Sequence, residues 1–102
     1  MDLERLTPEQ LTRLERWLSQ YPDLETLDAL LLERLEEAEG AGRSRLDSGK
    51  LSRELGVAHA LVRRAVSSLD VRGLITTASR SGASPGLWLS LTAHDDDRRG
   101  AE

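Results

Sequence analysis

The chain has 102 residues, of which 38% are hydrophobic and 31% are charged. This is the composition of one soluble globular domain, and the length leaves no room for a multidomain enzyme. Cysteine is absent, which excludes disulfides, thiolate metal sites and a thiol nucleophile. The first twenty residues are rich in charge and no stretch approaches roughly 18 apolar residues, so we expect no membrane span, no secretory signal and a cytoplasmic location.

The formal net charge of −4 conceals an uneven distribution along the chain. Residues 1–42 carry 4 basic and 11 acidic side chains, residues 43–94 carry 8 and 3, and residues 95–102 carry 2 and 4. The middle of the chain is therefore a basic block between two acidic segments. Such asymmetry favours a polyanionic partner, although acidic helices and tails also serve simply as solvated surfaces.

Two helices are predicted in the acidic third. Thr7, Pro8 and Gln10 form a strong helix start for a helix over residues 8–20, with a capping residue, a first-turn proline and a capping box. Asp23 can cap a second helix, over residues 23–39, whose leucine stripe is wider than one packing partner requires. This helix is buried either between elements of its own chain or in a subunit contact. The candidate dimer contacts are Leu11, Leu14, Trp17, Leu18, Leu31 and Leu35.

Two further helices are predicted in the basic block, separated by a very short turn. Ser48 can cap a helix over residues 49–55, and Gly56 stops it. A helix over residues 59–72 follows almost at once and ends at a second glycine. Two helices joined by three or four residues, with glycine in the turn, are typical of a helix-turn-helix.

After this pair the period of the apolar residues changes to that of strands. Residues 74–78 and 87–91 are predicted to form a hairpin around the turn-rich loop 80–86. Trp88 falls on the strand face opposite the leucines, so we expect it either to pack under the N-terminal helices or to lie at a subunit contact. Residues 93–102 are polar and without period, and we expect a disordered acidic tail.

The order helix, helix, turn, helix and hairpin resembles a winged helix-turn-helix. Residues 55–75 resemble the recognition segment of GntR-type bacterial repressors, residues 45–48 resemble the segment before the first helix of that motif, and residues 89–92 are similar to the last wing strand of MarR-type regulators. The resemblance implies a mainly α fold with a small β-hairpin wing. The expected divisions are an N-terminal helical extension over 1–22, a winged helix-turn-helix domain over 23–92 and the tail.

The resemblance also implies that helix 59–72 lies in the DNA major groove while the wing, 80–86, touches the backbone or the minor groove. The implied DNA-binding residues are Ser48, Lys50, Arg53, Ala58, His59, Ala60, Arg63, Arg64, Arg80 and Ser81. An arginine can form a bidentate contact with guanine or a charge-assisted contact with phosphate. The alternative for Arg63 and Arg64 is an ion pair with Asp70 or Glu54.

Catalysis has little support in the sequence. The two histidines, His59 and His94, are far apart, the acidic run 95–97 lies in the expected tail, and no glycine-rich phosphate loop occurs. A mobile segment cannot hold a preorganised metal or acid-base site. We therefore expect no enzyme, no metal and no cofactor.

The sequence is interpreted as a bacterial, sequence-specific double-stranded DNA-binding protein, a transcriptional regulator that acts as a homodimer on the nucleoid. The alternative is a winged-helix protein-protein interaction module in a transcription or chromosome-organising complex. Ala58 and Ala60, which replace the usual hydroxyl residues, and the apolar Leu61 favour this alternative.

Overall fold

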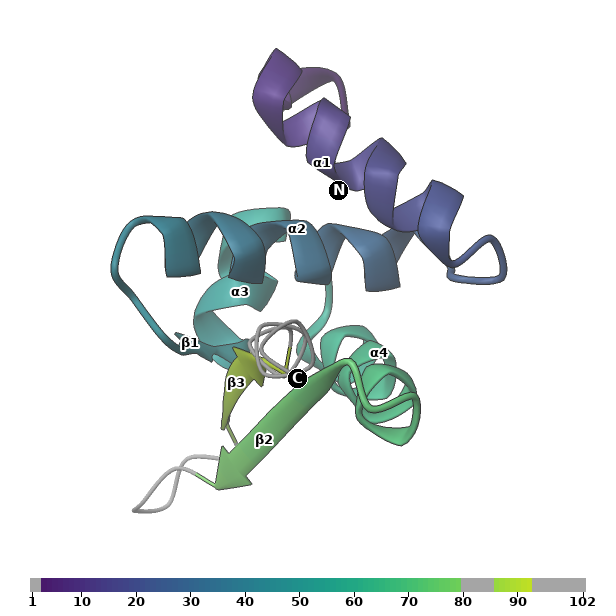
Figure 1. Ribbon diagram of the computed structural model, residues 1–102. Coiled ribbons are helices and arrows are strands. Elements are labelled where there is room, and N and C mark those ends of the chain that lie inside the picture. The colour runs from purple at the N-terminus through teal and green to yellow at the C-terminus, as the bar shows by residue number, and fades with distance from the viewer. Residues whose placement is uncertain (1–2, 80–85, 93–102) are drawn as a thin grey trace.

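The computed structural model describes residues 3–79 and 86–92, which form helices packed against a small sheet (Figure 1). The elements in chain order are a 3-10 turn over Leu3–Arg5, α1 (Pro8–Gln20), α2 (Thr26–Gly40), β1 (Leu46–Asp47), α3 (Ser48–Leu55), α4 (His59–Val71), β2 (Ile75–Ser79) and β3 (Leu87–Leu91). The predicted mainly α fold with a β-hairpin wing is confirmed.

Helix α1 begins at the predicted capping box. The Thr7 side chain accepts a hydrogen bond from the backbone N–H of Gln10, and the Gln10 side chain accepts one from the N–H of Thr7. Pro8 occupies the first helical position, where its missing N–H costs nothing. The boundaries 8–20 are therefore confirmed.

Helix α2 begins three residues later than predicted. Its N-cap is Glu25, which makes no side-chain capping bond. Asp23 is not a cap, because its carboxylate instead accepts two hydrogen bonds, of 3.2 and 2.8 Å, from the guanidinium of Arg72 at the end of α4. A charge-assisted bidentate pair outweighs a local cap. The prediction of a cap at Asp23 was wrong for this reason.

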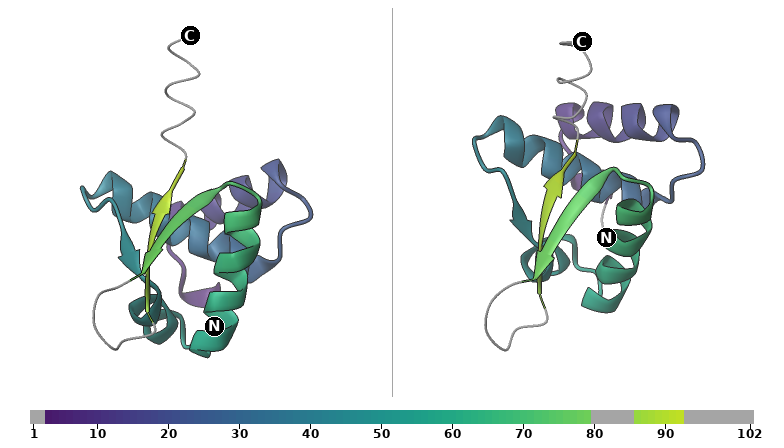
Figure 2. Two further views of the ribbon diagram at one scale, coloured as in Figure 1. Left: turned by 90° about the horizontal axis from the view of Figure 1, so that it is seen from below. Right: turned by 60° about the horizontal axis from the view of Figure 1, so that its bottom comes forward.

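Helix α2 is the centre of the molecule. Three consecutive leucines, Leu30, Leu31 and Leu32, are all fully buried, which requires contacts on more than one side of the helix. Helix α1 packs on one side of α2, and α4 and β3 pack on the other (Figures 1 and 2). The leucines of the wide stripe are thus buried by other elements of the same chain.

This burial corrects half of the predicted dimer contacts. Leu14, Leu31 and Leu35 lie in the core of the chain itself and offer no surface to a second copy. Trp17 and Leu18 are half-buried, and Leu11 remains 41% exposed. The indole N–H of Trp17 donates to Glu36 on α2, at 2.9 Å, so its polar edge is also used within the chain.

The sheet has three antiparallel strands in the order β1-β3-β2. Strand β3 lies in the middle and pairs Leu91 with Ile75 of β2 and Leu89 with Leu46 of β1. The two-residue strand β1 lies between the helices predicted over residues 23–39 and 49–55, where no strand was predicted. Alternate residues of β3 face the core, as the period of two predicts.

Trp88 lies on the outer face of this sheet, opposite the buried Leu89. The guanidinium of Arg45 lies over its ring, 4.1 Å from the centroid, a distance at which a cation is attracted by the aromatic face. The expectation that Trp88 packs under the N-terminal helices was therefore wrong.

Candidate nucleic-acid interface

The turn between α3 and α4 is built by local hydrogen bonds and one glycine. Gly56 has a φ of +65°, in the left-handed region that glycine adopts without strain. The next residue, Val57, donates its N–H to the carbonyl of Ser52, and its own carbonyl accepts from the Ser52 hydroxyl. Helix α4 then starts at His59. The sequence prediction of a tight helix-turn-helix is confirmed.

Helix α3 is capped by Asp47, whose carboxylate accepts from the N–H of Gly49 at 2.9 Å. The predicted cap, Ser48, is instead the first residue of the helix and is 0% exposed. Its hydroxyl accepts from the N–H of Leu87 at 2.9 Å and lies 2.9 Å from Nε2 of His59. Ser48 faces the interior and cannot reach a DNA phosphate in this structure, so its prediction as a DNA contact was wrong.

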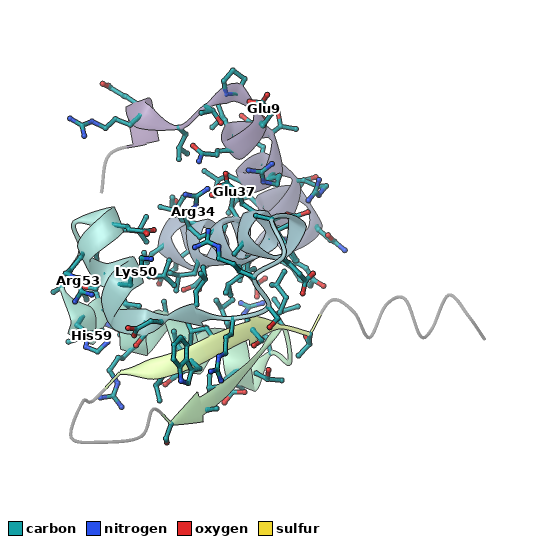
Figure 3. All side chains as sticks on the ribbon, turned by 90° about the vertical axis from the view of Figure 1, so that its left-hand side faces the viewer. Glu9, Arg34, Glu37, Lys50, Arg53 and His59 are labelled. Carbon is teal, nitrogen blue, oxygen red and sulfur yellow. The ribbon has the colours of Figure 1, made fainter. Side chains whose placement is uncertain are left out.

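Four exposed cations lie on α3 and α4, and we call them the basic surface. None of the four forms an ion pair with a residue that the structure describes, including Asp70 and Glu54, the two predicted alternatives. Figure 3 shows the two α3 members beside His59, at an edge of the molecule away from Glu9 on α1. The members are Lys50, Arg53, Arg63 and Arg64.

Other arginines of the chain are matched by carboxylates. Arg13 and Arg34 both contact Glu33, at 2.9 and 2.8 Å, and Arg34 also pairs with Glu37. Figure 3 shows Arg34 and Glu37 together on α2. Arg16 pairs with Glu36. The carboxylates of the acidic N-terminal third thus pair with Arg13, Arg16 and Arg34 of the same third and not with the basic surface.

The ion pair between Asp23 and Arg72 changes the pKa of both side chains. The hydrogen bonds from Arg72 lower the pKa of Asp23 below its usual value, and the same bonds raise the pKa of Arg72. Both side chains therefore stay charged around neutral pH. Arg72 lies in the basic block by sequence, but its charge is already compensated.

The exposed face of α4 continues beyond the predicted residues. Ala60, Arg63, Arg64 and Ser67 are all exposed and recur at spacings of three and four, so they share one side of the helix. The opposite side is buried and consists of Val62, Ala65, Val66 and Leu69. Ser67 was not among the predicted DNA-binding residues. Its position one helical turn after Arg63 and Arg64 is the sequence signal that places it on the same exposed face.

The first turn of α4 has no side-chain cap. Ala58 occupies the N-cap position, and its side chain makes no hydrogen bond. The carbonyl of Ala58 accepts from Leu61 and Val62. No capping side chain accepts from the backbone N–H groups of the first turn, which carry the positive end of the helix dipole.

The remaining predicted contacts lie outside the described residues. These are Arg80 and Ser81 of the predicted wing loop. The predicted acidic tail, 93–102, also lies outside the described residues. The described part of the wing, β2 and β3, has the predicted hairpin pairing, from Ile75 with Leu91 to Ser79 with Leu87.

A groove of about 420 Å³ lies between α4 and the start of α2 with the residues just before it. Leu61 and Arg64 of α4 line one side, and Asp23 and Asp28 line the other. Asp28 is 5% exposed, and its burial raises its pKa above the usual value.

Residues 3–79 and 86–92 contain no cluster of acidic residues and histidines that could hold a metal ion. No helix in the same ranges is both long and apolar enough to cross a membrane.

A helix-turn-helix whose second helix is followed by an antiparallel wing defines the winged helix-turn-helix fold, and this chain has that fold. The solved structure of the adhesin competence repressor AdcR from Streptococcus pyogenes is similar, with a TM-score of 0.55 over 91% of this chain and 73% of the other. The two sequences are 16% identical, so the likeness is one of fold. No protein-family model and no curated protein sequence matches the chain.

Proposed function

We propose that the protein binds double-stranded DNA in a sequence-specific way and acts as a transcriptional regulator. The observation that carries the proposal is the basic surface on α3 and α4. Cations without an internal partner bind phosphates without first breaking an ion pair, and release of counterions from DNA then drives binding. The similar structure is named a repressor, which agrees with a regulatory role.

In this proposal α4 enters the major groove with its exposed face toward the bases. Arg63 and Arg64 point about 100° apart on the helix, so one reads a guanine edge while the other contacts the backbone. Lys50 and Arg53 on α3 contact phosphates. The uncapped start of α4 offers backbone N–H groups to another phosphate. The wing contacts, Arg80 and Ser81, complete the proposed interface in the minor groove or on the backbone.

We further propose that two copies act together on two half-sites, since a single domain of this size buries little surface on DNA. The exposed side of α1 is the proposed contact, with Leu11 at its centre and Leu18 beside it. Binding to DNA would place the protein on the nucleoid, in the cytoplasm. No catalytic step is assigned, and the Ser48 hydroxyl beside His59 is buried away from any substrate.

A second candidate function is docking to another protein through α4. It is favoured by Leu61, which is 49% exposed on α4, and by the small apolar side chains Ala58 and Ala60 next to it. An exposed leucine of this size at the proposed DNA surface fits an apolar partner as well as a thymine methyl group.

The test is a titration of fluorescently labelled duplex DNA at several salt concentrations, with the mass in solution measured in parallel. The protein is compared with the double variant Arg63→Ala/Arg64→Ala and with the control Arg16→Ala, an exposed arginine already paired with Glu36 on the opposite side of the chain. We expect the double variant to lose most binding and the control to keep it.

Absence of binding to any duplex at low salt would refute the DNA-binding function, because even nonspecific phosphate contacts are strong there. Equal loss in the Arg16→Ala control would show that general charge, and not the basic surface, is responsible. A monomeric mass in the presence of a two-half-site duplex would refute the dimer alone.

A further inference from the structure

One buried hydroxyl group joins three elements of the fold. Ser48 is the first residue of α3, and its Oγ accepts a hydrogen bond from the N–H of Leu87, the first residue of β3, at 2.9 Å. The same oxygen lies 2.9 Å from Nε2 of His59, the first residue of α4. The base of the wing and the start of the proposed recognition helix therefore meet at one atom.

The hydrogen-bonding capacity of the three groups is consistent with a closed network. A serine hydroxyl has one donor hydrogen and two acceptor lone pairs. One lone pair receives the N–H of Leu87, so the hydroxyl hydrogen and the second lone pair both remain available for the contact with Nε2 of His59. Ser48 is 0% exposed, so water does not compete for either bond.

The position of this network matters because the two elements it joins approach DNA at different places. The recognition helix of a winged helix reads the major groove, and the wing touches the backbone or the minor groove. Both sets of contacts form together only if the wing base and the helix start keep a fixed separation. Binding groups must be held within about 0.5 Å to act together. His59 is half-buried and stands at the surface beside the basic surface (Figure 3).

We propose that Ser48 and His59 are positioning residues that hold the base of the wing in register with the recognition helix and so determine sequence preference. The inference rests on the proposed DNA binding. It gives His59 a role through Ser48 rather than by direct base contact, and it gives a function to a polar side chain at a fully buried position.

The experiment measures the affinity of each variant for a duplex selected from a random library and for a scrambled duplex. The variants are Ser48→Ala, His59→Ala, the double variant and His59→Gln, whose longer amide side chain can still hydrogen-bond to the hydroxyl. The control is Ser44→Ala, an exposed serine between α2 and β1. Thermal unfolding is recorded for all variants so that loss of fold is recognised.

We expect Ser48→Ala to reduce the preference for the selected duplex by about fivefold, the size of one net hydrogen bond, with affinity for the scrambled duplex unchanged. His59→Ala should reduce it similarly, His59→Gln should retain it, and the double variant should lose no more than either single variant. If Ser48→Ala fails to fold, the comparison of His59→Ala with His59→Gln still tests whether a hydrogen bond to the Ser48 hydroxyl is required for the sequence preference.

The proposal is overturned if the unaltered protein binds DNA and the variants keep its preference, or if the two single losses add, which would indicate a direct His59 contact. Parallel loss for both duplexes would show a purely structural role and would also overturn it. Failure of the unaltered protein to bind any duplex at low salt would instead refute the proposed function itself.

Discussion

Arg63 and Arg64 are adjacent on the exposed face of α4, and neither has a carboxylate partner within the described part of the chain. Replacing an arginine by lysine keeps the positive charge but removes the planar set of hydrogen-bond donors. The substitution therefore tests hydrogen-bond geometry separately from charge. A base contact depends on that geometry, and a phosphate contact depends mainly on the charge.

We therefore predict that Arg63→Lys reduces the preference for the selected duplex by about tenfold, the lower part of the range for a bidentate base contact, while nonspecific binding stays unchanged. Competition titrations with scrambled DNA measure this ratio. Lys50→Arg is the matched control, since it also keeps the charge and lies at a proposed phosphate contact. An unchanged preference in Arg63→Lys would assign Arg63 to the backbone.

Asp28 leads to a prediction about stability. Its pKa is raised by burial, so the folded state disfavours the charged form and stability is lost as the pH rises through the folded pKa. Asp28→Asn removes the charge and keeps an oxygen acceptor. We predict a higher unfolding temperature for the variant at pH 7 than for the parent, and little difference well below pH 3.8, the ordinary pKa. Thermal melts across this range measure the difference. A lower unfolding temperature at pH 7 would contradict the assignment.

The helix starts show which single residues can be predicted from sequence. Thr7 was identified correctly because its capping box is entirely local. Ser48 and Asp47 are neighbours that can both cap, and the choice was made by Leu87 and His59, which occupy the serine hydroxyl. Likewise, the Asp23 carboxylate accepts hydrogen bonds from Arg72, 49 residues away, and does not cap α2. Competition from distant partners cannot be read from a local pattern.

Among the elements, α1 and α2 are joined by a contact that is unusually polar. Glu33 of α2 is 0% exposed and lies between Arg13 of α1 and Arg34 of its own helix. Removing one partner of a buried ion pair is strongly destabilising, because the remaining charges stay poorly solvated.

We predict that Glu33→Ala lowers the free energy of unfolding by about 2–4 kcal/mol, toward the lower end for a buried pair because both arginines retain some access to water. Glu39→Ala is the control, since it removes the same charge from an exposed site on the same helix. Denaturant titrations of both variants test the difference. Equal effects in the two variants would mean that the buried pair contributes nothing beyond net charge.

The helices of the chain were predicted well from the sequence, and the strands less well. The periods of α1, α3 and α4 are local signals, and so are the glycines that follow α3 and α4. Strand β1 has two residues, Leu46 and Asp47, and exists because β3 pairs with it. So short a strand has no periodicity of its own, so nothing in the segment 43–47 could indicate it.

For the molecule as a whole, the segregation of charge determines how binding should respond to salt. The acidic side chains of α2 form ion pairs with Arg13, Arg16 and Arg34. The cations of the basic surface therefore keep their positive charge uncompensated although the net charge of the chain is −4. The negative end would orient the molecule with α3 and α4 toward DNA.

We predict that Lys50→Ala weakens binding to all duplexes alike and reduces the slope of log affinity against log salt by about 1, the change for one phosphate contact. The same loss of charge in Arg16→Ala should leave the slope unchanged. Fluorescence anisotropy at a series of salt concentrations gives both slopes. Equal slopes in Lys50→Ala and the parent protein would exclude Lys50 from the phosphate contacts.

The polar attachment of α1 also has a consequence for local unfolding. Helix α1 packs on α2, on the side away from β2 (Figure 1). That contact includes two ion pairs accessible to solvent, Arg16 with Glu36 and Arg13 with Glu37, which salt screens. The amides of α1 should therefore exchange their hydrogens with solvent through openings that leave α4 and the sheet folded. Their exchange rates should rise with salt, whereas those of α4 should follow global unfolding. The chain would then behave as a stable core with a terminal helix that the ionic strength of its surroundings can loosen.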